Sequence, residues 1–137
     1  MRVSFYSDAD EPLRFACRLI RRVLAQGQPL GVVAADETLR ELDALLWSFD
    51  PTAFIPHRRT GTGAPGEVLL VEDAALLQHR AVLLNLGDVV PPAAAEFARI
   101  LEVVPSAPEG RAAGRRRYRE YQSLGALLDH FSAQPAA

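Results

Sequence analysis

The sequence predicts an α/β domain of three layers, in which helices cover both faces of a mainly parallel central sheet. Three apolar runs, Leu30–Ala35, Val68–Val71 and Ala81–Leu86, are continuous rather than alternating. Such runs are typical of strands that are covered on both faces. Stretches with a helical spacing of apolar residues separate them, as in parallel sheets. A chain of 137 residues is long enough for one domain of ordinary size. We therefore expect a single domain over residues 1–137, with a frayed tail at 132–137.

The first two elements are a strand and an amphipathic helix. Arg2–Ser7 alternates and is rich in β-forming residues, which predicts a strand. Asp8, Asp10 and Pro12 then provide turn, N-cap and first-turn signals for a helix, and Gly27 ends it. The apolar stripe of this helix consists of Leu13, Cys17, Ile20 and Leu24.

A second strand and helix follow. Leu30–Ala35 is the strand, and Asp36 is placed to cap the helix after it. The leucine stripe of that helix leads to Trp47 near its end. Pro and Gly residues between 50 and 66 predict an irregular connection before the strand Val68–Val71.

The remaining elements are predicted by apolar runs and prolines. Ala81–Leu86 is a buried strand, and Pro91-Pro92 opens a helix that carries Phe97, Ile100 and Leu101. Glu102–Val104 starts a last strand, which Pro105 ends. Gly110–Leu124 is the final helix.

Composition excludes several classes of chemistry. All 15 basic residues are arginine, which removes mechanisms that need a lysine, such as a Schiff base or a Walker A loop. The one cysteine excludes a disulfide framework and a cysteine-built zinc site. No apolar run approaches the roughly 20 residues that span a bilayer, and the N-terminus becomes acidic within its first residues. We therefore expect a cytoplasmic protein with no membrane partner.

The motifs that suggest catalysis have simpler explanations. Residues 61–66 read G-x-G-x-x-G, but they precede a strand instead of opening a helix, so we expect a loop and no dinucleotide site. Asp8 and Asp10 could hold Mg²⁺, although capping and turn formation explain them more simply. The three histidines are widely spaced and no nucleophile motif is present. We therefore expect no enzyme activity, no metal and no cofactor.

The most informative segment is a basic helix near the end of the chain. Five arginines lie between Arg111 and Arg119, although the net charge of the chain is −2. Helical spacing places Arg111, Arg115, Tyr118 and Arg119 on one face. Guanidinium groups bind carboxylates or phosphates, and aromatic rings add an apolar wall. This face therefore suits an acidic peptide that ends in a hydrophobic residue, or a single-stranded nucleic acid. The third possibility is a solvated helix face.

Several segments resemble the chi subunit of bacterial DNA polymerase III holoenzyme. The longest is Leu45–His57 (LLWSFDPTAFIPH), which is followed by a Gly-rich loop. Asn85-Leu86 matches the end of a family strand. Arg115-x-x-Tyr118-Arg119-x-Tyr121 matches the last helix of the family. The resemblance covers residues 3–128.

The resemblance implies a fold like that of nucleotide-binding proteins without a functional phosphate loop, and a non-catalytic adaptor in replication. It implies binding of the acidic C-terminal tail of single-strand DNA-binding protein, which ends in Pro-Phe, and of the psi subunit of the clamp-loader complex. The implied tail-binding residues are Trp47, Arg115, Tyr118 and Arg119, to which helical spacing adds Arg111. The implied psi interface is Phe54, Ile55, Pro56 and His57. Contact with nucleic acid is then mostly indirect, and the protein is a monomer or a heterodimer with psi. Direct binding of single-stranded nucleic acid by the basic helix is the alternative.

Overall fold

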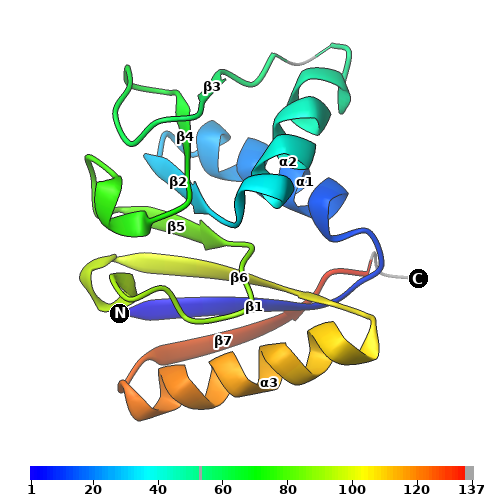
Figure 1. The fold of residues 1–137 in the computed structure, drawn as a ribbon, viewed down its shortest axis with the longest axis vertical. Coiled ribbons are helices and arrows are strands. Elements are labelled where there is room, and N and C mark those ends of the chain that lie inside the picture. Colours follow the sequence, from blue (N-terminus) through cyan, green and yellow to red (C-terminus); the bar gives the residue numbers. More distant parts are fainter. Residues whose placement is uncertain (53, 135–137) are drawn as a thin grey trace.

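Seven parallel strands form one sheet in the computed structural model, which describes residues 1–52 and 54–134 (Figure 1). Within this described part of the chain the strand order is β3-β4-β2-β5-β6-β1-β7, and each pair of neighbours is parallel. The predicted fold class is confirmed. The strands are β1 (Arg2–Ala9), β2 (Leu30–Val33), β3 (His57–Arg58), β4 (Val68–Val71), β5 (Val82–Asn85), β6 (Arg99–Pro105) and β7 (Leu127–Ser132).

Helices cover both faces of this sheet. On one face, α1 (Pro12–Ala25) and α2 (Asp36–Ser48) pack on the central strands in one core cluster. On the other face, α3 (Pro108–Ser123) and two single turns, η1 (Ala74–Leu76) and η2 (Ala94–Glu96), belong to a second cluster. Figure 1 shows α3 running along β6 and β7, away from α2. Within the residues described, the structure has no helix long and apolar enough to cross a membrane.

Both predicted N-caps are wrong by one position or more. The cap position of α1 is Glu11, without a side-chain hydrogen bond. Asp10 instead accepts a hydrogen bond from Gln134 (2.7 Å), and hydrogen bonds from Ser106 and Gln134 lower its pKa. Asp36 is the first residue of α2 rather than its cap, and its carboxylate pairs with two arginines, Arg40 at 2.9 Å and Arg59 at 2.8 Å.

The predicted helix after Pro91-Pro92 is wrong. Only the short turn η2 forms there, and Arg99–Pro105 is the strand β6. Ile100 through Val104 are all buried, because β6 lies between β5 and β1 and is covered on both faces. A helix would bury only one stripe of this run, so tertiary burial decides for a strand.

The sequence also did not predict β7. Leu127–Ser132 pairs in parallel with β1 at the edge of the sheet, with Ser132 opposite Ser7. Residues 132–134 are therefore not a frayed tail, because Gln134 also donates to the carbonyl of Asp8 (2.7 Å). The rest of that predicted tail, residues 135–137, lies outside the described residues.

Candidate functional site

A cleft of about 530 Å³ lies between the N-terminal half of α3 and the ends of β1 and β7. The register of β7 against β1 pairs Phe5 with His130, so both side chains are on the face that α3 covers. The cleft therefore joins one helix to two strands that are far apart in sequence. It is lined by Phe5, Ser7, Asp8, Val104, Arg111, Gly114, Arg115, Tyr118 and His130.

The helix side of the cleft carries positive charge. Arg111 and Arg115 are exposed and line it one turn apart. Among the described residues, no carboxylate lies within 4.0 Å of either guanidinium. Arg119 is also exposed but does not line the cleft. The structure thus brings together three of the predicted tail-binding residues, Arg111, Arg115 and Tyr118, and places Arg119 beyond its edge.

The floor of the cleft is apolar and aromatic. Phe5 and Val104 are buried beneath it, and Tyr118 is half-buried at its side. The rings of Phe5 and Tyr118 meet edge to face, with centroids 5.2 Å apart. An apolar floor below unpaired guanidinium groups suits a ligand that combines a hydrophobic group with negative charge.

Two glycines let α3 lie close to β6. A Cβ atom at Gly114 would lie 2.7 Å from Cγ1 of Val104, and one at Gly110 would lie 2.7 Å from Cβ of Pro105. Both distances are shorter than the contacts that Cβ atoms make in proteins, so a larger residue at either position would force its neighbour to move. Gly114 therefore sets the depth of the cleft beside Arg111 and Arg115, which Val104 also lines, and Gly110 lets the first turn of α3 contact Pro105.

Gly114→Ala is expected to lower the free energy of unfolding by about 1 kcal/mol, because overpacking costs about 1–3 kcal/mol and the gain in helix propensity is about 1 kcal/mol. In a Val104→Ala background the added methyl group has room, so the same substitution should stabilise the protein. Urea denaturation of the four proteins measures both effects. An effect of the same sign in both backgrounds would contradict the close approach.

A buried ionic network fixes the rotation of α3. Arg117 is 3% exposed and donates from Nε to Glu102 in the middle of β6 (2.9 Å). The same carboxylate accepts from the Tyr121 hydroxyl (2.6 Å) and the Asn85 side chain (2.9 Å). Burial raises the pKa of Glu102, and the Arg117 guanidinium opposes that rise. Because Arg117 points inward, Arg111 and Arg115 point outward.

A second surface consists of Trp47, Phe54 and Pro56, of which Phe54 and Pro56 were predicted for the psi interface. Phe54 is 72% exposed and Trp47 is 61% exposed, and their ring centroids are 5.8 Å apart. Trp47 also packs on His57, at 4.7 Å. Trp47 does not line the cleft beside α3, so the structure does not bring it to Arg115, contrary to our expectation. The physical reason is that α2 and α3 lie on opposite faces of the sheet.

Not all of the predicted psi-interface residues are accessible. Ile55 is 3% exposed in the core, and the His57 side chain is 1% exposed. His57 Nδ1 donates to the Ile55 carbonyl (2.7 Å). Its Nε2 lies 2.8 Å from Asp43 Oδ1, which is within ion-pair distance. The geometry between these two atoms is not that of a hydrogen bond. Phe54, half-buried Pro56 and Trp47 therefore provide the apolar contact area, and His57 supports Trp47 from beneath.

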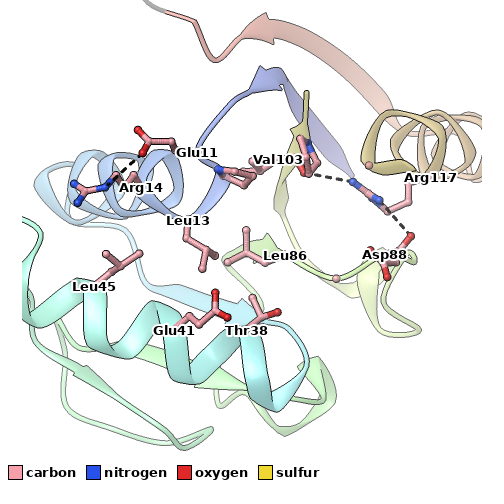
Figure 2. A pocket seen from close by; sticks show the side chains of 14 residues that line it. Glu11, Leu13, Arg14, Thr38, Glu41, Leu45, Leu86, Asp88, Val103 and Arg117 are labelled. Atoms are coloured by element: carbon pink, nitrogen blue, oxygen red, sulfur yellow. Dashed lines mark hydrogen bonds and ion pairs between the residues drawn. The ribbon is translucent and has the colours of Figure 1, made fainter. Parts of the chain in front are cut away.

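A separate cleft of about 450 Å³ opens at the carboxyl ends of β5 and β6 (Figure 2). This is where open parallel sheets commonly bind ligands. Figure 2 shows Glu11, Glu41 and Asp88 around its apolar wall. The Arg117 in its lining is already engaged, with Glu102 and with the carbonyls of Asp88 and Val103. The surplus of carboxylates disfavours a phosphate ligand at this place.

The glycine loop and the cysteine provide little chemistry. In the loop, the Gly63 amide donates to Gln78 (3.1 Å) and the Ala64 amide donates to Glu67 (2.7 Å). Both donors are therefore occupied by this chain.

Burial raises the pKa of Cys17 to about 11, so its thiol is protonated at neutral pH. In the described part of the chain, no three His, Cys, Asp or Glu side chains form a group that could hold a metal ion.

Comparison with known proteins gives consistent matches. The model of the family described as "DNA polymerase III chi subunit, HolC" matches residues 1–129. The chain is 38% identical over 135 residues to the DNA polymerase III subunit chi of Pseudomonas aeruginosa, which covers 94% of this chain and 95% of that protein. It is 28% identical over 115 residues to the protein of the same name from Haemophilus influenzae, with 80% and 79% covered.

Proposed function

The chain belongs to the family of the DNA polymerase III chi subunit, and we propose that it is a non-catalytic replication adaptor. Its cleft beside α3 binds the acidic C-terminal tail of single-strand DNA-binding protein. Its aromatic surface at Trp47 and Phe54 binds a psi-like subunit. The two surfaces together link the polymerase holoenzyme to coated single-stranded DNA.

One observation carries the tail-binding proposal: two guanidinium groups that have no carboxylate partner among the described residues stand over an aromatic floor in the same cleft. Arg111 and Arg115 provide the charge, and Tyr118 with Phe5 provides the floor. An acidic peptide that ends in phenylalanine has the complementary pair of features. Its side chain fills the apolar part while its carboxylates face the arginines.

The expected affinity is modest and depends on salt. Burying a phenylalanine side chain contributes about 1.5–3 kcal/mol. Each charge-assisted contact adds about 1.5–3 kcal/mol before the cost of ordering the peptide. The sum corresponds to dissociation constants of the order of micromolar, weakening as ionic strength rises. Several tails on one oligomer would raise the effective affinity.

The proposal is tested with single-stranded DNA coated by the cognate single-strand DNA-binding protein. Surface plasmon resonance should detect binding of this chain to the coated DNA. A coat made of protein that lacks its last residues should not bind. Equal binding to both coats would overturn the tail as the ligand.

The direct nucleic-acid alternative rests on the same arginines, and naked single-stranded DNA is its test. It predicts binding to a bare oligonucleotide with a steep salt dependence and no preference for the acidic peptide. The net charge of −2 disfavours it. The apolar floor of the cleft also suits a peptide with a single terminal ring better than a continuous strand of bases.

For the second surface, Phe54→Ala is expected to abolish co-purification with the psi-like partner, because an exposed aromatic anchor often dominates an interface. Phe54 packs on Trp47 and is otherwise exposed, so the substitution should leave the fold intact. The measurement is size-exclusion chromatography of the co-expressed pair. Leu76→Ala, another exposed apolar residue at 65%, is the matched control and should retain the partner. Retention by Phe54→Ala would place the psi-like interface elsewhere.

A further inference from the structure

His130 lines the strand side of the cleft, opposite the arginines of α3. It lies on β7, opposite Phe5 of β1, and faces α3 across the cleft. Its Nε2 lies within hydrogen-bond distance of the Ser7 hydroxyl (2.8 Å). Histidine and serine thus form a polar wall opposite the arginines.

Groups of both signs face this wall. Arg111 and Arg115 line the cleft on α3, together with the Tyr118 hydroxyphenyl group. On the strand side the one carboxylate in the lining is Asp8, which lies within the register shift of β1 between Tyr6 and Ala9 and has a φ of 60°. Asp129, the next carboxylate along β7, pairs with Arg2 at 2.8 Å and alternates to the other face.

We propose that His130 is a specificity residue of the tail site, whose protonation adds a third positive charge and makes tail binding depend on pH. This inference rests on the proposed function. Histidine is the side chain type whose charge commonly changes between about pH 5 and 8, and this one lines the cleft opposite the two arginines. The carboxylates of an acidic peptide stay ionised over that range. Affinity therefore increases as the pH falls.

The expected size follows from one added charge-assisted contact. Binding of a labelled acidic peptide ending in Pro-Phe should be about three- to tenfold tighter at pH 5.5 than at pH 7.5, at constant ionic strength. The other two histidines do not line the cleft, since His57 lies beneath Trp47 and burial lowers the pKa of His79. They should not contribute to this change.

Two substitutions separate charge from shape. His130→Gln keeps a polar side chain without a titratable proton, so its affinity should stay near the wild-type value at pH 7.5 and should not change with pH. His130→Arg carries a permanent charge, so its affinity should be high at both pH values. Fluorescence anisotropy of the three proteins at several pH values gives the comparison.

The outcomes distinguish this inference from the function on which it rests. Wild-type binding that does not change with pH, or a full pH dependence in His130→Gln, would overturn the role of His130 and leave the tail site standing. Loss of binding by the wild type at every pH would overturn both. A pH dependence that is present in the wild type and absent from both variants supports the inference.

Discussion

Arg115→Glu is expected to weaken binding of the acidic tail peptide by at least about 100-fold at low salt. The substitution removes a guanidinium that lines the cleft and has no partner within the described chain. It also places a negative charge where the carboxylates of the peptide are expected. Arg115 is exposed, and its side chain makes no hydrogen bond or ion pair with the described residues, so thermal stability should change little. Isothermal titration calorimetry measures the affinity.

Arg116→Glu is the matched control. Arg116 is the next residue on α3, is exposed and does not line the cleft. Its replacement changes the net charge by the same amount, so any long-range effect is equal in the two variants. We expect only a small loss of affinity, which salt suppresses. Equal losses in both variants would show a general charge effect and not a site.

The second large effect concerns stability. Arg117→Ala should lower the free energy of unfolding by about 3–5 kcal/mol, because it leaves the buried carboxylate of Glu102 without its cation. Tyr121 and Asn85 would still donate to that carboxylate, but they carry no charge. The measurement is urea denaturation followed by circular dichroism.

Arg116→Ala, on the same helix, controls for helix propensity and exposure. Surface substitutions of this kind usually change stability by less than about 0.5 kcal/mol. A loss below 1 kcal/mol in Arg117→Ala would mean that the ion pair does not hold α3 on β6. The two adjacent arginines thus have opposite expected roles, one in the core and one in solvent.

Local sequence signals predicted much of the fold. The continuous apolar runs became β2, β4 and β5, and the helix predicted over Gly110–Leu124 is α3, shifted by two residues at its start. Gly27 ends α1 with a φ of 73°, as a C-terminal glycine should. These signals are local, since burial on two faces and helix termination act within a few residues.

The errors arise where tertiary packing decides. Ile100 and Leu101 follow Phe97 at the three- and four-residue spacing of a helix. They lie instead in β6, which is covered on both faces. β7 is an edge strand whose residues are mostly exposed, so it has no apolar run to reveal it. Because β7 was missed, the sequence could not place His130 in the cleft.

The sequence predicted only part of the candidate site, because local spacing can be predicted from sequence and tertiary packing cannot. Helical spacing is local, and it correctly placed Arg111, Arg115 and Tyr118 on one face. The family resemblance could not tell which face of the sheet carries Trp47, since that depends on the crossover of α2. A signal for the ionic network was present, because Glu102 interrupts an apolar strand and a buried carboxylate needs a cation.

The most direct test of the adaptor role is fluorescence anisotropy with a labelled peptide of about the last ten residues of the cognate single-strand DNA-binding protein. We expect saturable binding by the wild-type chain, with a dissociation constant of the order of micromolar that rises with salt. A peptide that lacks only the terminal phenylalanine should not bind, because the apolar floor of Phe5 and Tyr118 is then empty. Equal binding of the two peptides would show that the cleft does not bind the terminal phenylalanine, and no binding of either at low salt would overturn the tail site.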